Sequence, residues 1–233
     1  MTERGMIFNA EMVRAILAGR KTQTRRIMKV QPESNQLGLL LITDSTKHSD
    51  IGKYHWAESN ATGNHVRSKL FSCPFGAVGD RIWVRETWSS DFANYYPNDR
   101  VWYAADNNRR LDIEVVDGVR GIYSPESDVH VPFRWQPSIH MPRWASRILL
   151  EITDVRVEPL NAISEEDATA EGVPPAGSLL PDYPGTFLTP KGDFATAKVA
   201  FQRLWESIYG EESWKANSWV WVISFKRVEG GAA

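Results

Sequence analysis

The stretch from residue 9 to residue 26 constrains the fold of this chain more than any other. It begins with Asn9, a good helix N-cap residue, and hydrophobic side chains then recur at helical spacing. Gly19 is expected to end this helix, because glycine takes the left-handed backbone conformation at little steric cost. The polar run Arg-Lys-Thr-Gln-Thr-Arg-Arg follows at residues 20–26. Since threonine favours extended backbone, we expect a short strand directly after the helix.

The polar run carries more cations than helix stability explains. The C-terminus of a helix bears partial negative charge, so one or two basic residues there are ordinary. Here two threonines lie among four basic side chains, which are Arg20, Lys21, Arg25 and Arg26. This density of polar side chains indicates a functional segment.

Residues 16–25, Ile-Leu-Ala-Gly-Arg-Lys-Thr-Gln-Thr-Arg, resemble the opening signature of ASCH domains. These domains are small β-barrels related to the PUA fold, and the family is associated with RNA binding. Its small bacterial members include an amidohydrolase that removes the acetyl group from N4-acetylcytidine. There a lysine and a threonine three residues apart act as base and nucleophile, and a later glutamate completes the set. The resemblance implies these roles for Lys21, Thr24 and Glu171.

The choice of Glu171 also has a physical basis. Ser164 is expected to cap a short helix that runs to Glu171 and ends at Gly172. Acidic residues near the start of that helix are explained by the helix dipole, whereas a glutamate at its end is not. Glu165 and Glu166 lie close by and remain alternatives, as does a Glu171 that is merely solvated.

The expected fold is α+β, a single elaborated ASCH domain over residues 1–233 with a PUA-like β-barrel and flanking helices. The resemblance covers about residues 6–30, 76–88 and 135–228, and its long version is similar to phage and prophage members. Two insertions are then expected at about residues 31–75 and 89–134. Strands are predicted at residues 148–158 and 219–225, a proline-rich loop over the site at 173–193, and an amphipathic helix at 194–209.

Further side chains are candidates for binding a substrate or a nucleic acid. The strand after Gly79-Asp80 offers cations, an acid and an aromatic ring, and the segment around residues 138–147 offers cations and another ring. The alternatives are an Arg–Glu ladder on the wet side of a barrel strand, and a tight turn whose tryptophan packs into the core. The full set of binding candidates is Arg20, Arg25, Arg85, Glu86, Trp88, His140, Arg143, Trp144 and Arg147.

Charge is distributed unevenly although the net charge is only −2. Residues 1–30 contain seven basic and two acidic side chains, whereas residues 150–190 contain one basic and eight acidic ones. A basic edge that faces an acidic edge suits a site needing both a lysine and a carboxylate, although two solvated faces would give the same composition.

Composition also indicates the cellular compartment and the kinds of partner to expect for this chain. Cys73 is the single cysteine, so no intramolecular disulfide can form and a reducing cytoplasm is the expected location. Neither a secretory signal nor an apolar run of membrane-spanning length is recognisable, so no membrane partner is expected. The scattered histidines fit no familiar zinc spacing, and we expect neither a metal nor a cofactor.

Four functions remain open from the sequence. The first is an amidohydrolase that removes an acyl group from N4-acylated cytosine, cytidine or a related modified nucleoside. The others are an RNA-binding module without catalysis, a ribonuclease, and a structural or partner-binding domain. The expected partner is thus a modified nucleoside or RNA, while the oligomeric state is not determined by the sequence.

Overall fold

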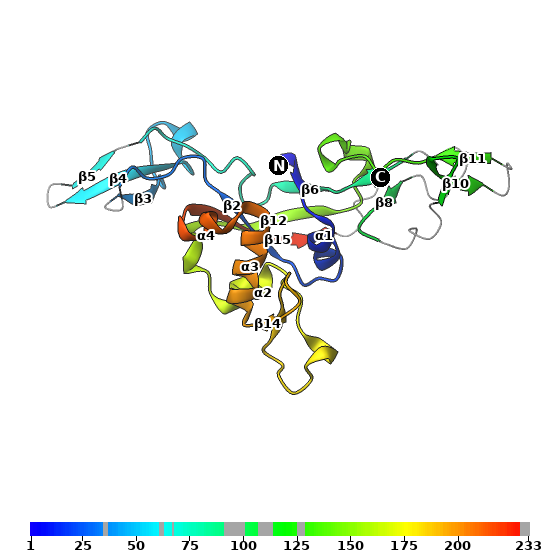
Figure 1. Ribbon diagram of the computed structural model, residues 1–233. Coiled ribbons are helices and arrows are strands. Elements are labelled where there is room, and N and C mark those ends of the chain that lie inside the picture. The colour runs from blue at the N-terminus through cyan, green and yellow to red at the C-terminus, as the bar shows by residue number, and fades with distance from the viewer. Residues whose placement is uncertain are drawn as a thin grey trace.

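The computed structural model describes residues 1–34, 37–60, 63–66, 68–90, 101–106, 114–124 and 129–228. They form a mixed α+β fold around one five-stranded sheet (Figure 1). Its strands lie in the order β1 (Glu3–Ile7), β6 (Arg81–Arg85), β12 (Leu149–Pro159), β15 (Trp219–Arg227) and β2 (Gln23–Ile27). β1 runs parallel to β6, and the other neighbouring pairs are antiparallel.

This sheet is open, which differs from the expected closed barrel. Within the described residues, no backbone pairing joins its edge strands β1 and β2. A side chain bridges them instead, because the Arg26 guanidinium donates to the Ile7 carbonyl at 2.8 Å. Helix α1 (Ala10–Leu17) connects the same two strands, and Val13 and Ile16 join the core beneath it. The helix thus occupies the place where the edges would otherwise have to pair.

The N-terminal helix forms as its sequence predicts. The Asn9 side chain accepts a hydrogen bond from the Met12 amide at 2.8 Å, which satisfies one free donor of the first turn. Gly19 has φ +72°, the left-handed conformation that ends the helix. Strand β2 begins at Gln23, so the predicted change from helix to strand is confirmed.

Two hydrophobic cores lie on opposite faces of the sheet, and β15 contributes to both. Alternate side chains of a strand point to opposite faces, so Trp221 and Ile223 enter the core beneath α1, whereas Val220 and Val222 enter the other core. That second core is covered by α2 (Glu165–Ala170), α3 (Ala197–Tyr209) and α4 (Glu211–Lys215). The strand predicted at residues 219–225 is therefore confirmed, and it is buried on both faces.

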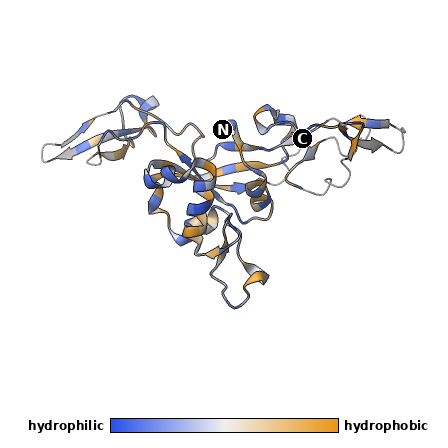
Figure 2. Cartoon of the chain, viewed as in Figure 1, coloured by the Kyte–Doolittle hydropathy of each residue, from blue (hydrophilic) through white to orange (hydrophobic). Residues whose placement is uncertain are grey.

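Helix α3 starts three residues later than predicted. Phe194 and Ala195 form the short strand β14 (Phe194–Ala195), which pairs with β13 (Phe187–Leu188), and the helix follows. Its two faces differ in hydropathy, as Figure 2 shows, and Phe201 and Trp205 are buried. The predicted proline-rich loop at residues 173–193 thus includes β13, the first strand of a small hairpin, and forms a lobe beside α3 (Figure 1).

Two smaller sheets extend from either side of the main sheet (Figure 1). One consists of β3 (Gly38–Leu41), β4 (Tyr54–Asn60) and β5 (Gly63–Val66), and Trp56 packs on Trp219 with ring centroids 5.1 Å apart. The other consists of β9 (Glu114–Val116), β10 (Val119–Ser124) and β11 (Val129–Pro132), next to the pair β7 (Trp88–Ser89) and β8 (Trp102–Tyr103).

Short 3-10 turns connect these elements. They are η1 (His48–Asp50), η3 (Ser138–His140), η4 (Arg143–Ala145), η5 (Leu160–Ala162) and η6 (Gly177–Leu179). The turns η3 and η4 lie in the segment whose two prolines predicted an extended or turning chain. In the parts of the chain that the structure describes, no helix has the length and apolar character needed to cross a membrane.

The central strand β12 should be the most sensitive part of the fold. Leu150 is 0% exposed, so replacing it with alanine leaves a cavity and should lower the free energy of unfolding by about 2–5 kcal/mol. Urea unfolding of Leu150→Ala measures this loss. Val78→Ala, at a position 64% exposed, is the matched control and should change stability by less than about 0.5 kcal/mol. Equal losses in the two variants would contradict the placement of the core.

Candidate active site

A buried ion pair joins the end of α1 to the end of α2. The Lys21 ammonium lies 2.6 Å from the Glu171 carboxylate and also donates to the backbone carbonyl of Glu171 at 2.8 Å. The two side chains are 0% and 3% exposed. Burial of a charge is tolerated only where it is paired and hydrogen-bonded, so each group requires the other. A merely solvated Glu171 is thereby excluded.

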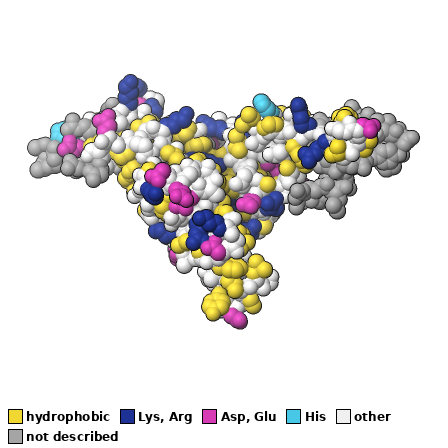
Figure 3. Space-filling model, viewed as in Figure 1, with side chains coloured by type: hydrophobic (Ala, Val, Ile, Leu, Met, Phe, Trp, Pro, Cys, Tyr) yellow, Lys and Arg dark blue, Asp and Glu magenta, His cyan; other side chains and the backbone are white. Residues whose placement is uncertain are grey.

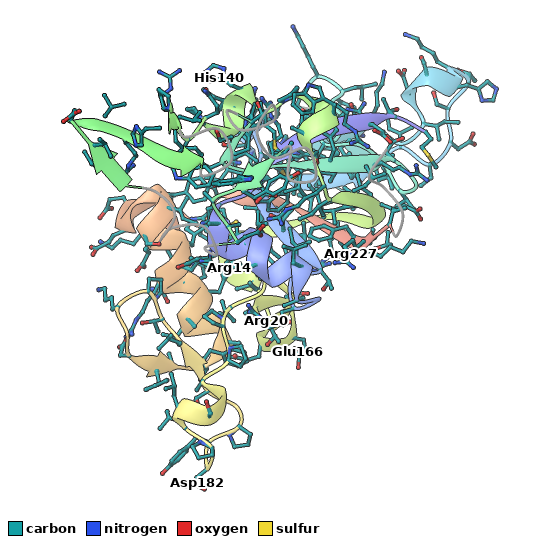
Figure 4. The ribbon with its side chains drawn as sticks, turned by 90° about the vertical axis from the view of Figure 1, so that its right-hand side faces the viewer. Arg14, Arg20, His140, Glu166, Asp182 and Arg227 are labelled. Atoms are coloured by element: carbon teal, nitrogen blue, oxygen red, sulfur yellow. The ribbon has the colours of Figure 1, made fainter. Side chains whose placement is uncertain are left out.

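The local chain geometry explains why Glu171 occupies this position. Ser164 caps α2 through a hydrogen bond from the Asp167 amide, and Glu171 is the C-cap residue, as the sequence predicts. Gly172 follows with φ +89°, and a Cβ there would lie 2.7 Å from the Lys21 Cβ. A glycine is therefore needed both for the turn and for the close approach of Lys21. The other two acidic candidates, Glu165 and Glu166, are exposed on α2, and Figure 4 shows Glu166.

Lys21 belongs to the helix end and not to the strand. Its amide donates to the Ala15 carbonyl of α1, whereas Thr22 bonds both to Ala170 of α2 and to Phe225 of β15. The alternation of side chains along β2 therefore does not apply to Lys21. The turn between the end of α1 and the start of β2 changes the backbone direction, and any cooperation between Lys21 and Thr24 requires such a change.

The surroundings of Lys21 favour its neutral form. Burial lowers the pKa of Lys21 from the ordinary 10.5, and this is the largest effect. Glu171 opposes it, while the charges of Arg26 and Arg25 lower the pKa further. Two neighbouring arginines thus contribute to the shift, but removal of the ammonium from water dominates. A lysine with a lowered pKa is better able to accept a proton near neutral pH.

Arg25 holds the other side of the Glu171 carboxylate. Its guanidinium lies 3.3 Å from Glu171, 2.5 Å from Glu158 and 2.9 Å from Asp167, and it donates to the Gln23 side chain at 2.6 Å. The Arg25 side chain is 0% exposed. Protein carboxylates and an amide thus already engage this guanidinium away from solvent, whereas a role of Arg25 as a substrate contact stays a prediction.

The Thr24 hydroxyl is buried and lacks a hydrogen-bond partner among the described residues. Thr24 lies opposite Ile223 of β15 and is 1% exposed. It lines a small cavity together with Glu171, so the two predicted site residues meet there. The Lys21 ammonium forms its hydrogen bonds with Glu171 and not with Thr24. A buried hydroxyl without a partner is costly, which marks Thr24 as a functional candidate.

A larger pocket of about 490 Å³ opens beside this cluster. Its walls come from α1, from the turn at residues 171–174, from the hairpin loop at residues 188–192 and from α3. Arg14 and Arg20 line it on the side of α1, where Figure 4 shows them. Arg20 also donates to the Gly172 carbonyl at 3.0 Å. The pocket volume falls in the range of small-molecule sites, and the predicted proline-rich segment forms part of its wall.

The remaining binding candidates form a second group. Glu86 is 1% exposed and receives two hydrogen bonds from Arg147, at 2.9 and 3.0 Å. Arg147 also pairs with Asp106 at 2.6 Å, and its guanidinium lies 3.9 Å from the centre of the Tyr103 ring. Burial raises the pKa of Glu86 and raises that of Tyr103 to about 12. Glu86 and Arg147 thus satisfy each other, which corrects their expected role as free contacts for a base.

Trp88 and Trp144 of this second group pack against each other as a tryptophan pair. Trp88 is buried, so its ring is not free to stack on a base, whereas Trp144 is 62% exposed and meets it edge-on. Arg85 donates to the backbone carbonyls of Ser138 and Ile139. Trp144 is thus not a core residue, contrary to one alternative considered for this turn.

His140 and Arg143 complete that group. His140 is exposed and lies far above Arg14 and Arg20 in Figure 4. Arg143 pairs with Glu3 at 2.9 Å. Within the described ranges, no hydrogen bond or ion pair connects this second group to Lys21, Thr24 or Glu171. The structure therefore divides the predicted site residues between two places.

Sequence reasoning missed the carboxylates and the arginine that support Glu171. Arg156 of β12 pairs with Asp167 at 2.5 Å and with Glu158 at 3.4 Å, and Asp167 also accepts from Gln23 at 3.1 Å. The uneven charge of residues 150–190 was the available signal, since it placed excess acid there. It did not indicate which acids would meet Arg25, because that depends on how α2 packs against β2 and β12.

Neither similarity to known proteins nor a cluster of metal-binding side chains in the described residues assigns a function to this site. In the described part of the chain, no group of three or more His, Cys, Asp or Glu side chains could hold a metal ion. Comparison with protein-family models, with curated proteins and with solved structures finds nothing that matches this chain. The chemistry of the site is therefore inferred from its own side chains.

Gly172→Ala should disturb the site directly. The alanine would adopt a left-handed conformation and press on Lys21 and on the Ala15 side chain 3.0 Å away, so stability should fall by at least about 2 kcal/mol. Thermal unfolding measures the loss. Gly185→Ala is the control, since a Cβ there meets nothing within 4 Å, and it should unfold like the parent protein. An unchanged Gly172→Ala protein would contradict the close packing of Lys21.

Proposed function

We propose that this protein is an amidohydrolase that removes an acyl group from N4-acylated cytosine, cytidine or a related modified nucleoside. One observation carries the proposal. The buried Lys21–Glu171 pair and the partnerless Thr24 hydroxyl converge beside a pocket of about 490 Å³. A base, a nucleophile and a carboxylate are the groups that acyl transfer from an amide requires.

The proposed reaction has two stages. Neutral Lys21 accepts the proton of the Thr24 hydroxyl and passes it to Glu171 across their 2.6 Å contact. The Thr24 oxygen attacks the acyl carbon, and the C–N bond breaks as the departing 4-amino group takes a proton from Lys21 or Glu171. Water then attacks the acyl-threonine and releases the carboxylic acid. Since hydrogen bonds of a catalytic set often form only with substrate bound, the missing Lys21–Thr24 bond is compatible with this route.

Arg25 acts in this proposal through Glu171. By binding one carboxylate oxygen at 3.3 Å it leaves the other for Lys21, which fixes the direction in which the proton moves. Asp167 and Glu158 balance the charge of Arg25 on its far side. The network thus positions the proton carrier, and Arg25 also lines the small cavity next to Thr24.

We also propose that the chain is an elaborated ASCH domain of the PUA-like class. The helix, the glycine stop and the Arg-Lys-Thr run support this, as does the side-chain bridge from Arg26 to Ile7 between the edge strands. An open sheet whose edges approach one another is compatible with a barrel that the N-terminal helix has interrupted. The smaller sheets at residues 38–66 and 114–132 would then be insertions.

Thr24→Val should abolish the release of cytidine from N4-acetylcytidine, followed by chromatography. Valine keeps the shape of threonine and removes only a hydroxyl that lacks a hydrogen-bond partner among the described residues. The melting temperature should therefore stay the same or rise. Loss of activity at preserved stability separates a catalytic hydroxyl from a structural one. Full activity in this variant would sink the proposal.

Lys21→Met should also lose turnover, because it removes the group proposed to accept the Thr24 proton. This variant leaves Glu171 buried with one partner fewer, so we expect a loss of about 3–5 kcal/mol in unfolding free energy. Ser207→Ala on the exposed side of α3 is a suitable control for expression and handling. A stable and fully active Lys21→Met enzyme would refute the base assignment.

The pH dependence of turnover follows from the lowered pKa of Lys21. A base must be deprotonated, so kcat/KM should rise with pH as Lys21 loses its proton. The midpoint should lie below the ordinary lysine value of 10.5, since burial favours the neutral amine. Initial rates on N4-acetylcytidine in buffers from pH 5 to pH 10 measure it. A rate that falls over this range would argue against Lys21 as the base.

RNA binding is the second candidate function, favoured by one observation. Trp144 and His140 are both exposed and belong to two successive 3-10 turns, and an exposed aromatic ring of this kind is able to stack on an unpaired base. The face in Figure 3 argues against a strong interaction, because basic and acidic side chains are interspersed on it. A titration of single-stranded RNA at two salt concentrations tests this, since phosphate contacts weaken steeply with salt. A cleavage assay on the same RNA tests the ribonuclease alternative.

A further inference from the structure

A second, much smaller cavity lies behind the catalytic candidates. Its volume is about 10 Å³, which is close to the room needed by a single water molecule or methyl group. Thr24, Arg25, Arg26 and Glu171 form its polar side. The rest of the lining is mainly hydrophobic and comes from α1 and α3, with Met12, Phe201, Leu204, Trp205 and Ile208 as its large side chains.

The two cavities meet at a shared boundary. Met12, Glu171 and Leu204 line both the small cavity and the pocket of about 490 Å³. Thr24 lines only the small cavity, whereas Arg14 and Arg20 line only the large one. A substrate cleaved at Thr24 must therefore span the boundary, with its scissile bond next to Glu171.

We propose that the small cavity is the acyl subsite and that Met12 and Leu204 determine which acyl groups are accepted. This rests on the proposed amidohydrolase function and adds a restriction to it. The cytosine and its sugar occupy the large pocket, and the acyl group points into the small cavity toward the Thr24 oxygen. Because that cavity has room for little more than a methyl group, acetyl is the preferred acyl group.

Two aromatic side chains in the wall of the small cavity are packed into the second hydrophobic core. Phe201 and Trp205 are 3% exposed, pack against each other with centroids 5.9 Å apart, and belong to the second core. The Arg25 guanidinium lies 5.9 Å from the Phe201 ring, which ties this wall to the charged network. Met12 and Leu204 are only partly buried and stand at the boundary, so they are the side chains whose size can change without loss of the core.

Longer acyl chains should therefore be rejected. A hydrophobic pocket discriminates by about 10-fold to 200-fold for each methylene that it must reject. N4-butyrylcytidine carries two methylenes more than N4-acetylcytidine. The parent enzyme should thus favour the acetyl substrate by at least about 10-fold in kcat/KM. Leu204→Ala removes a side chain at the boundary and should reduce that preference by about 10-fold or more.

The experiment measures kcat/KM for both substrates in the parent protein and in three variants. Leu204→Ala and Met12→Ala each enlarge the boundary from a different helix, so a folding defect in one leaves the other informative. Val199→Ala is the matched control, because Val199 lies on α3 and lines neither cavity. It should keep the parent preference. Thermal unfolding of each variant confirms that it is folded.

The outcomes separate this proposal from the function on which it rests. Release of cytidine from neither substrate by the parent protein would overturn both. Release from both substrates at similar rates would leave the amidohydrolase in place and overturn the acyl subsite. The same holds if folded Leu204→Ala and Met12→Ala keep the parent preference. A shift toward the butyryl substrate in these variants, absent in Val199→Ala, is the expected result.

Discussion

The structure of this site depends on keeping one ammonium group out of water. Lys21 is fully buried, and a buried charge destabilises a protein unless a partner of opposite charge and further acceptors lie within hydrogen-bond distance. Glu171 supplies both its carboxylate and its backbone carbonyl. The end of α1 must therefore meet the end of α2, and Gly172 permits the close approach. Burial lowers the pKa of Lys21, whereas the pairing with Glu171 opposes this shift.

A shell of alternating charges extends from this pair to the surface. Arg25 balances Glu171, Asp167 and Glu158 balance Arg25, and Arg156 closes the series at a partly exposed position. Each member has partners on two sides, so the shell is held in one arrangement. The Thr24 hydroxyl differs from this shell, because it is buried without a hydrogen bond. A buried hydroxyl without a protein partner is expected of a nucleophile whose contacts form only with bound substrate.

The local elements could be predicted because short-range chemistry controls them. Asn9 and Ser164 cap helices, and Gly19 and Gly172 end them, wherever those helices lie in the fold. The open edges of the sheet and the partners of Arg25 and Glu86 could not be predicted, because each depends on a contact between distant segments. Glu86, for example, is expected to face a ligand until Arg147 is seen to occupy both of its oxygens. The start of α3 was misplaced because Phe194 pairs in a hairpin instead of joining the helix.

The sequence by itself indicated the helix that ends at Gly19, the strand after it and the short helix that ends at Gly172, because caps, glycine stops and hydrophobic periodicity act over a few residues. The lysine, threonine and glutamate of the site were implied by the resemblance to ASCH domains. Tertiary structure alone decided that Glu171, and neither Glu165 nor Glu166, pairs with Lys21, since adjacent residues on one helix point in different directions. It also decided that Thr24 borders a cavity while Arg25 does not reach the solvent. Burial, which sets the pKa of a lysine and the reactivity of a hydroxyl, is a property of packing between distant segments, and no short stretch of sequence specifies it.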